Sequence, residues 1–487
     1  MSLCWIFATP IFGAPDEPAH SIRAYSVAHL EILGRENKKH DLEVDAPLGY
    51  SKTGGSITCY AFFESIPASC EHVSNDTKIV PLTTAAGRHT PFYYFAAGLP
   101  TLLLQNGKSV FLMRLVSALI TAFFVAASVA SLRRLRQARA ACLGLAVALT
   151  PLVWFVSGTV NPSAAEIAGG LGLWTAGGVL ALRARNEVDG ALVRRAALGA
   201  IVLCLSRQLG PAWLLATAFV LAIAAGWEGV KRIWASRSAR LWGIGVAAAA
   251  VTTLLWNFIV KPVQPRAEEM MNVSTWDAAW ESLADTFNRY KEIVGWFGWL
   301  DAPPTDLMVT VFSIALVGLA ALAFVYGKRR LWWLGMLTAL GTVLAPVVFE
   351  AYGAHDLGYF WQSRYTLPIA VGVPLMFGFS LAARDRTPSN ARAVNLGVIV
   401  VGALMAVHQV LGFGNALRRN TVGFGPTDTF DFFLDPIWKP PFPAWFLMLG
   451  IVVATAAFYY WLVGVDPSER SASVDSSDAD GPAVAVG

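Results

Sequence analysis

The sequence predicts an all-α fold, a polytopic bundle of about 11–12 transmembrane helices with extracytoplasmic loops. Of its 487 residues, 55% are hydrophobic and only 14% are charged, which is too little polar surface to cover a soluble globule of this size. The apolar residues come in runs of about 17 to 22, long enough for a helix to cross roughly 30 Å of hydrocarbon, whereas barrel strands are shorter and alternate in polarity. Short clusters of Arg and Lys between the runs fall on one side of the span count, and the positive-inside rule makes that side cytoplasmic.

The predicted spans follow these runs in order. They lie at residues 2–12, 109–130, 140–157, 164–182, 196–206, 211–226, 241–260, 306–326, 331–349, 366–383, 394–412 and 444–465. Segment 2–12 is a shortened first span; a secretory signal peptide is the alternative, disfavoured because the segment has no basic start and no small-residue cleavage site. Segments 196–206 and 211–226, separated by Arg207, Gly210 and Pro211, form either two spans or one broken re-entrant hairpin.

The long connections all emerge opposite the basic clusters. Residues 1–465 are expected to form one membrane domain, with 13–108 as its first extracytoplasmic loop and 261–305 as an extracytoplasmic amphipathic segment. Residues 466–487 are rich in Ser, Asp, Ala and Gly, which predicts a disordered cytoplasmic tail. We therefore expect a multi-pass protein of the cell membrane whose active face is extracytoplasmic.

The segment 261–305 carries an apolar stripe. Trp276, Trp280, Leu283 and Phe287 recur at spacings of four, three and four, which predicts an amphipathic helix lying on the membrane surface in contact with lipids. Such a helix either guides a lipid substrate or only caps the bundle, and both interpretations remain open.

Two of the five cysteines, Cys59 and Cys70, lie in the first long loop. An oxidising exterior permits a disulfide between them, and two free thiols are the alternative. Their spacing matches no zinc-binding pattern.

Adjacent carboxylates follow the first apolar segment, at Asp16 and Glu17. Carboxylates are costly to keep beside a membrane, so these two are the first candidates for catalysis. If a helix follows Pro18, then Asp16, His20 and Arg23 project on one side of it, and Glu17 points about 100° away. This favours Asp16 as a general base, with His20 and Arg23 beside it.

Further candidates lie far away in the sequence. Arg207 and Arg364 are predicted to bind the phosphate of a leaving group through their guanidinium forks, and His89 is a further substrate-binding candidate. The alternatives are a helix-break residue for Arg207 and an interfacial anchor for Arg364. Asn161 is expected to cap a helix that begins at Pro162.

Several classes of function are disfavoured. The sequence contains no Gly-rich phosphate loop, dinucleotide fingerprint, nucleophile elbow or His-Glu-x-x-His motif. The net charge of +4 comes from short loops between spans, so it reports orientation and gives no support for nucleic-acid binding. No cofactor is certain; carboxylates and histidines on the outer face leave a divalent cation open, although they show no recognisable ligand spacing.

Five segments carry a resemblance to a known family. They are ATPIFGAPDEPAH at 8–20, HTPFYY at 89–94, NPSAAE at 161–166, SRQLGP at 206–211 and QSRYTLP at 362–368. Together they resemble the DUF2142 family of bacterial polytopic membrane proteins, which looks like a member of the GT-C group of glycosyltransferases. The resemblance spans about residues 8 to 460, and Pro-Asp-Glu-x-x-His is its most specific motif.

The resemblance implies an enzyme that passes a sugar from a polyprenyl-phosphate donor to an extracytoplasmic glycan or lipid acceptor during cell-envelope glycan synthesis. The hallmark acid of the first outer loop falls on Asp16, with Glu17 as its neighbour. The alternative is a polytopic transporter or a flippase for lipid-linked glycans, whose mark is ionisable residues at mid-membrane depth. Arg114, Arg207 and His408 are the chief residues of that kind here. A scaffold for envelope-polymer assembly is a third interpretation.

Overall fold

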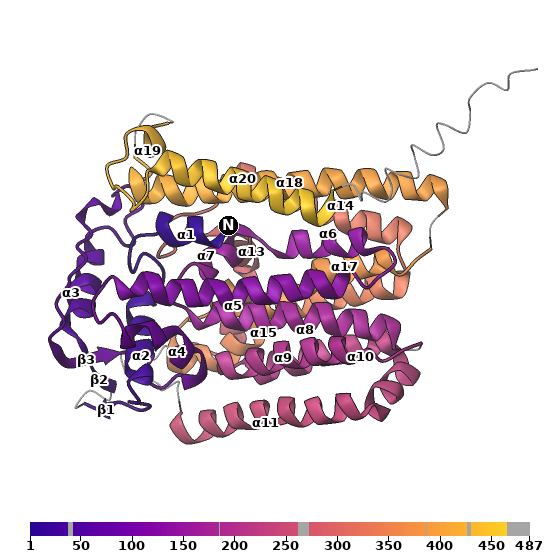
Figure 1. The fold of residues 1–487 in the computed structure, drawn as a ribbon, viewed down its shortest axis with the longest axis horizontal. Coiled ribbons are helices and arrows are strands. Elements are labelled where there is room, and N and C mark those ends of the chain that lie inside the picture. The colour runs from indigo at the N-terminus through magenta and orange to yellow at the C-terminus, as the bar shows by residue number, and fades with distance from the viewer. Residues whose placement is uncertain (38–41, 185, 262–271, 386, 426–429, 465–487) are drawn as a thin grey trace, which may run out of the picture.

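The computed structural model describes the chain except for residues 38–41, 185, 262–271, 386, 426–429 and 465–487. Most helices run side by side along one direction, and a small sheet with several short helices gathers at one end of the bundle (Figure 1). The tail predicted at 466–487 lies outside the described residues.

Eight helices in the described part of the chain are long and apolar enough to cross a membrane. They are α5 (Ser109–Leu132), α8 (Pro162–Arg183), α10 (Gly210–Ala235), α11 (Arg237–Val260), α14 (Asp306–Tyr326), α15 (Arg329–Leu357), α18 (Pro388–Thr421) and α20 (Ala444–Val463). The bent pair α6 (Ala138–Ala148) and α7 (Pro151–Ser157), which meet at 68°, is a ninth candidate. The predicted helical membrane bundle is therefore confirmed.

The eight or nine candidate spans in the described part of the chain are fewer than the 11–12 predicted. Segment 2–12 contains only the seven-residue helix α1 (Ser2–Ala8), and segment 366–383 is divided between α16 (Leu367–Ala370) and α17 (Gly372–Ala382). Helix α9 (Gly190–Ser206) has 17 residues, and at about 1.5 Å per residue it is shorter than roughly 30 Å of hydrocarbon. A continuous apolar stretch thus overestimates helix length wherever the backbone breaks within it.

The basic clusters share one end of the bundle. Arg133 and Arg139, which follow α5, donate hydrogen bonds to the carbonyls of Trp461 (3.4 Å) and Val463 (3.1 Å) at the end of α20. Gln137 donates to the carbonyl of Arg384 at 2.7 Å, just after α17. In Figure 1 this end lies opposite the small sheet.

Residues 13–108 fold into a compact cap that the predicted loop did not anticipate. It contains α2 (Glu17–Ala28), α3 (Leu48–Ser56), α4 (Pro91–Gly98) and the 3₁₀ turns η1 (Ile57–Cys59), η2 (Ala68–Cys70) and η3 (Leu99–Leu102). Its antiparallel sheet is ordered β1 (Arg35–Glu36), β2 (Leu42–Pro47) and β3 (Ile79–Thr84), with Val44 opposite Leu82. Buried side chains such as Val44, Tyr50 and Tyr94 form a core for this cap. A disulfide joins Cys59 to Cys70, whose Cα atoms lie 6.4 Å apart.

The amphipathic segment is not the single helix that the stripe predicted. It is divided at Asp285 into α12 (Thr275–Ala284) and α13 (Thr286–Gly295). Trp276 and Trp280 remain largely exposed, while the opposite face, with Ala278 and Ser282, is buried and packs on α15. Two short elements complete the fold, the 3₁₀ turn η4 (Ser363–Tyr365) and helix α19 (Asp431–Leu434).

Candidate functional site

Asp16 stands immediately before α2 in a left-handed conformation, with φ 64° and ψ 1°. Aspartate tolerates this region better than most residues, because its short side chain clashes little. The carboxylate makes no capping bond to α2 and instead forms an ion pair with Arg364 of η4. The side chain of Asp16 is 48% exposed and that of Arg364 only 7%. A buried cation therefore holds a carboxylate that solvent and substrate can reach.

Arg207 joins this pair through Tyr365. The guanidinium carbon of Arg207 lies 4.1 Å from the centroid of the Tyr365 ring, and that of Arg364 lies 5.2 Å from the same centroid. Arg207 follows the last residue of α9 in an extended conformation, donates to Ser163 Oγ at 2.7 Å and lies 4.0 Å from Glu166. Two arginines on one aromatic ring place two fixed positive charges beside Asp16, an arrangement suited to a phosphate.

Two histidines meet at one tyrosine on the same side of the cap. Nδ1 of His20 lies 2.9 Å from the Tyr94 hydroxyl, and Nδ1 of His89 lies 3.1 Å from it. Since the hydroxyl has a single proton, it donates to one histidine and accepts from the other. The pKa of His20 lies well below its ordinary value, chiefly because the side chain is buried and to a smaller extent because of the positive charges of Arg364 and Arg207. Neutral His20 therefore contributes polarity without charge.

Arg23 is turned towards the backbone. It is fully buried, donates to the carbonyls of Ile32 (2.7 Å) and His89 (2.9 Å), and lies 5.9 Å from the Tyr94 centroid. Burial lowers its pKa to about 10. These contacts hold the segment that carries His89 in place, so Arg23 contributes to the site by positioning His89.

Glu17 points away from Asp16, as the helical geometry predicts. Its fully buried carboxylate accepts from Nε (2.8 Å) and Nη2 (2.7 Å) of Arg114 and from the Val160 N–H (2.9 Å). Arg114 also donates to three backbone carbonyls between Ile6 and Pro10. Because every oxygen of Glu17 is occupied, we propose that this residue joins the cap to α5 and takes no part in catalysis.

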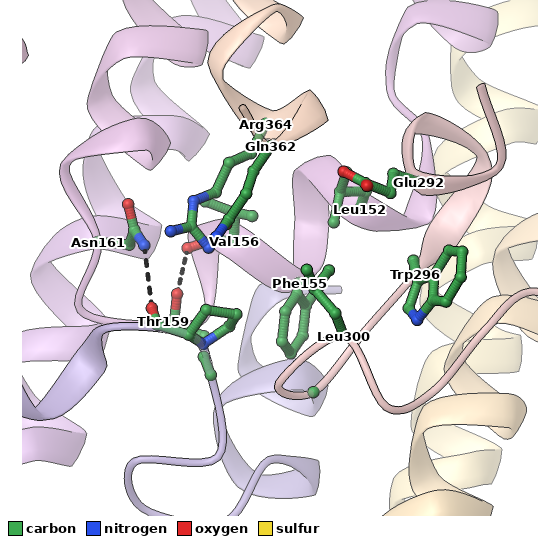
Figure 2. A pocket seen from close by; sticks show the side chains of 13 residues that line it. Leu152, Phe155, Val156, Thr159, Asn161, Glu292, Trp296, Leu300, Gln362 and Arg364 are labelled. Atoms are coloured by element: carbon green, nitrogen blue, oxygen red, sulfur yellow. Dashed lines mark hydrogen bonds between the residues drawn. The ribbon is translucent and has the colours of Figure 1, made fainter. Parts of the chain in front are cut away.

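A small pocket lies beside the Asp16–Arg364 pair, between the start of the cap and the α7, α13 and η4 segments. Figure 2 shows Arg364 and Gln362 pointing into it from one side and Glu292 and Trp296 from another. Arg364 Nε, Gln362 Oε1 and Trp296 Nε1 are buried without a hydrogen-bond partner among the described residues. The cavity measures about 20 Å³, enough for one water molecule, so a larger ligand requires the surrounding segments to open.

An apolar groove lies between α4, α5, α8 and α9 and has a volume of about 530 Å³. Phe92, Leu119 and Phe123 line it, as does Ser206, the residue that precedes Arg207 in the chain. Its apolar walls suit a hydrocarbon chain.

Other outer-face candidates serve the fold. Asp301 forms a buried ion pair with Arg419 at 2.6 Å and accepts from the Phe62 N–H at 3.0 Å, joining the cap to α18. His355 and Asp356 contact each other on the exposed surface. The described residues contain no group of three or more His, Cys, Asp or Glu side chains placed to hold a metal ion.

Tyr365, Tyr94 and Ser163 lie at the site but were not among the predicted site residues. Tyr365 adjoins Arg364, and Tyr94 lies within the HTPFYY segment, but an aromatic residue at a membrane interface gives the same pattern when it is only an anchor. Asn161 caps α8 as predicted, since its side chain accepts from the Ser163 N–H at 2.9 Å.

The fold and the site define a multi-pass helical membrane protein with a charged cluster at one end of the bundle. The chain belongs to the family described as predicted membrane protein (DUF2142), whose model matches residues 1–373. No curated protein matches the sequence.

Two solved structures are similar to this chain. They are the crystal structures of ArnT from Cupriavidus metallidurans in the apo state and bound to undecaprenyl phosphate. Each is 14% identical, with a TM-score of 0.43 and 95% of this chain covered; the share of the ArnT chain is 75% for the apo structure and 76% for the bound one.

Proposed function

We propose that this protein is a membrane glycosyltransferase that moves a sugar from a polyprenyl-phosphate-linked donor to a hydroxyl of an extracytoplasmic acceptor in cell-envelope glycan synthesis. The observation that carries the proposal is the position of Asp16. It is a half-exposed carboxylate beside two arginines on one tyrosine ring, and Arg207 directly follows a residue that lines the apolar groove.

The chemistry follows from these positions. The acceptor oxygen forms a bond to the anomeric carbon as the bond from that carbon to the donor phosphate breaks, with inversion. Asp16 takes the proton of the acceptor hydroxyl, and Arg207 and Arg364 neutralise the charge that develops on the departing lipid phosphate. The donor phosphate competes with Asp16 for Arg364, so arrival of the donor frees the carboxylate to act as a base.

The groove supports a lipid donor. Its walls are mainly apolar side chains of α4, α5 and α9, and Arg207 directly follows Ser206 of its lining in the chain. In this proposal the prenyl chain buries its apolar surface in the groove. Its phosphate is bound separately, by hydrogen bonds from the guanidinium of Arg207.

The orientation follows from the charges. Basic clusters contact one another at the end of the bundle opposite the cap, where Gln137 donates to the Arg384 carbonyl and Arg183 to the Arg134 carbonyl, and the positive-inside rule favours a cytoplasmic position for that end. The cap with its Cys59–Cys70 disulfide then faces an oxidising exterior, as does Asp16.

A transporter would need mobile charges along a path through the bundle. Arg114 is held by Glu17 and by backbone carbonyls, and His408 Nε2 is hydrogen-bonded to the Val294 carbonyl at 3.0 Å. These contacts hold two of the buried residues that a transport path would use, which favours the enzyme.

Transfer of radiolabelled sugar tests the proposal. Purified protein in nanodiscs is given a polyprenyl-phosphate sugar and a membrane extract as acceptor. Asp16→Asn is expected to reduce transfer at least 100-fold, within the usual range of about 10²–10⁴ for a general base. Asp306→Asn, which changes an exposed carboxylate at the start of α14, is the control with full transfer. Wild-type transfer by Asp16→Asn would overturn the assignment.

Orientation has a separate test. Leu30, at the end of α2, is 76% exposed, so a Leu30→Cys variant presents a thiol on the cap. A membrane-impermeant maleimide should label this thiol in intact cells. Labelling only after lysis would place the cap in the cytosol and contradict the proposal.

A further inference from the structure

A second hollow opens beside the site pocket and is lined mainly by polar side chains. It has a volume of about 490 Å³, within the usual range for small-molecule sites. Its walls come from α12, α13, α15 and the segment before η4, and its principal lining residues are Glu281, Asp285, Arg289, Glu350, Tyr359 and Trp361. None of these residues has a task in the proposed transfer reaction.

This hollow shares a wall with the site pocket. Residue Gln362 is extended, with φ −120° and ψ 141°, and successive side chains of an extended segment point to opposite sides. Accordingly, Trp361 lines the outer hollow, whereas its neighbour Gln362 lines the site pocket. A ligand in the outer hollow thus lies one backbone thickness from the residues of the reaction site.

The shared wall is firmly held. The Trp361 N–H donates to Glu350 at 3.0 Å, and the Ser363 N–H donates to Glu292 at 2.7 Å. Ser363 Oγ also donates to the Arg289 carbonyl at 2.9 Å. The two cavities are therefore fixed relative to each other, as required for subsites that bind two parts of one molecule.

One buried arginine that lines the hollow, Arg289, has an N–H group that makes no hydrogen bond among the described residues. Arg289 is 7% exposed and forms an ion pair with Glu350, yet its Nε lies 3.6 Å from Asp285 and has no hydrogen-bond partner among the described residues. The Asp285 side chain is 43% exposed, and the Tyr359 hydroxyl donates to the exposed Glu281. A buried donor next to two accessible carboxylates suits a ligand that both accepts and donates hydrogen bonds.

The charges that line the hollow favour a cationic ligand over an anionic one. Three carboxylates, those of Glu281, Asp285 and Glu350, face a single guanidinium, that of Arg289. The excess negative charge repels a phosphate or a uronic acid and attracts an ammonium group.

We propose that the outer hollow is an acceptor subsite that binds a sugar unit carrying a free amine, adjacent to the unit that receives the transferred sugar. The inference rests on the proposed function, since it assumes that the site pocket holds the reacting sugar. The hydroxyls of the bound unit meet Arg289 and Tyr359, and its ammonium meets Glu281 and Asp285.

Direct binding tests the subsite without a transfer reaction. Full-length protein in nanodiscs is titrated with a fluorescently labelled glucosamine disaccharide, its N-acetylated form, and a disaccharide that contains glucuronic acid. The free-amine sugar is expected to bind at least 10-fold more tightly than the N-acetylated form, and the uronate weakest. Equal affinities for the three sugars would overturn the proposal.

Variants locate the binding. Glu281→Gln and Asp285→Asn are each expected to weaken binding of the amine sugar about 10-fold without lowering the melting temperature, because both side chains are accessible. Asp277→Asn, one turn earlier on α12 and outside the hollow, is the matched control with unchanged binding. Unchanged binding by both hollow variants would place the amine elsewhere and refute the subsite.

The two proposals fail differently. Asp16→Asn should still bind the amine sugar, because Asp16 does not line the hollow. If that variant keeps full transfer while the hollow variants lose binding, the catalytic assignment is wrong and the subsite stands. If it loses transfer while the hollow variants bind normally, the enzyme stands and the subsite is wrong.

Discussion

Asp16 and Arg364, which are 348 residues apart in the sequence, form an ion pair at the cap end of the bundle. The pair is asymmetric, because the arginine is buried and the aspartate is half exposed. The cation is fixed by its surroundings and the anion is free to change partners, so a competing phosphate displaces the carboxylate and leaves the arginine in place.

Replacing either arginine by lysine should impair donor binding although the charge is kept. Lysine cannot bind a phosphate through two parallel N–H groups or lie flat on Tyr365. We expect Arg364→Lys and Arg207→Lys each to raise the KM for the lipid donor about 10-fold, measured in the nanodisc transfer assay. Arg136→Lys, at the opposite end of the bundle and 89% exposed, is the control. A donor KM equal to that of the wild type in both variants would exclude phosphate binding by these side chains.

Glu17→Gln should destabilise the protein, although its neighbour Asp16→Asn should not. Removing the Glu17 charge leaves Arg114 uncompensated in a fully buried position, and breaking a buried pair in this way costs about 3–5 kcal/mol. Asp16 is half exposed, so its loss costs little. The melting temperatures of Glu17→Gln and Asp16→Asn, measured in detergent, are compared with that of the wild type; both variants replace a carboxylate by an amide at adjacent positions. A Glu17→Gln variant as stable as the wild type would contradict the structural role.

Much of the bundle was predictable because hydrocarbon thickness sets helix length. Five of the eight long helices, such as α5 and α14, lie close to their predicted ranges, since an uninterrupted apolar run has no alternative to a helix in lipid. The three exceptions are longer than predicted: α10 continues to Ala235 past a kink at Gly226, α15 continues to Leu357, and α18 extends beyond its apolar core at both ends. Polar continuation of a helix outside the membrane leaves no signal in hydropathy.

The candidate site was predictable in part. The spacing of Asp16 and His20 indicated a shared direction for their side chains, and both approach the Arg207 and Arg364 region. The role of Tyr365 was not predictable, because it depends on where two distant segments of the chain meet. The sheet of the cap was missed because its strands are short and β1 has only two residues.

Reduction of the cap disulfide should lower stability in a measurable way. Cys59 and Cys70 are separated by 11 positions, and closing a loop of about 15 residues contributes roughly 3 kcal/mol in the chain-entropy treatment. We therefore expect dithiothreitol to lower the melting temperature of the wild type. The Cys59→Ser/Cys70→Ser variant should melt at the lower temperature with or without reductant; a reductant effect that persists in this variant would show that another group is responsible.

Acidification should destabilise the cap through its histidines. The folded state holds the pKa of His20 well below its ordinary value, through burial and two nearby arginines, and that of His89 is lowered chiefly by burial. In the unfolded chain each titrates near 6.5, so above that pH both states are neutral and the full stability is present. As the pH falls below about 6.5, the unfolded chain binds protons that the folded chain does not bind, and the free energy of unfolding decreases by roughly 1.4 kcal/mol per pH unit for each histidine.

Melting temperatures should therefore fall between pH 7 and pH 5. His20→Gln should reduce the slope of melting temperature against pH, because a neutral amide has no proton to bind. His72→Gln, at an exposed position of the cap, is the matched control and should leave the slope unchanged. An equal slope in the wild type and in His20→Gln would mean that His20 is already charged in the folded protein, and the neutral role assigned to it beside Arg207 and Arg364 would then be wrong.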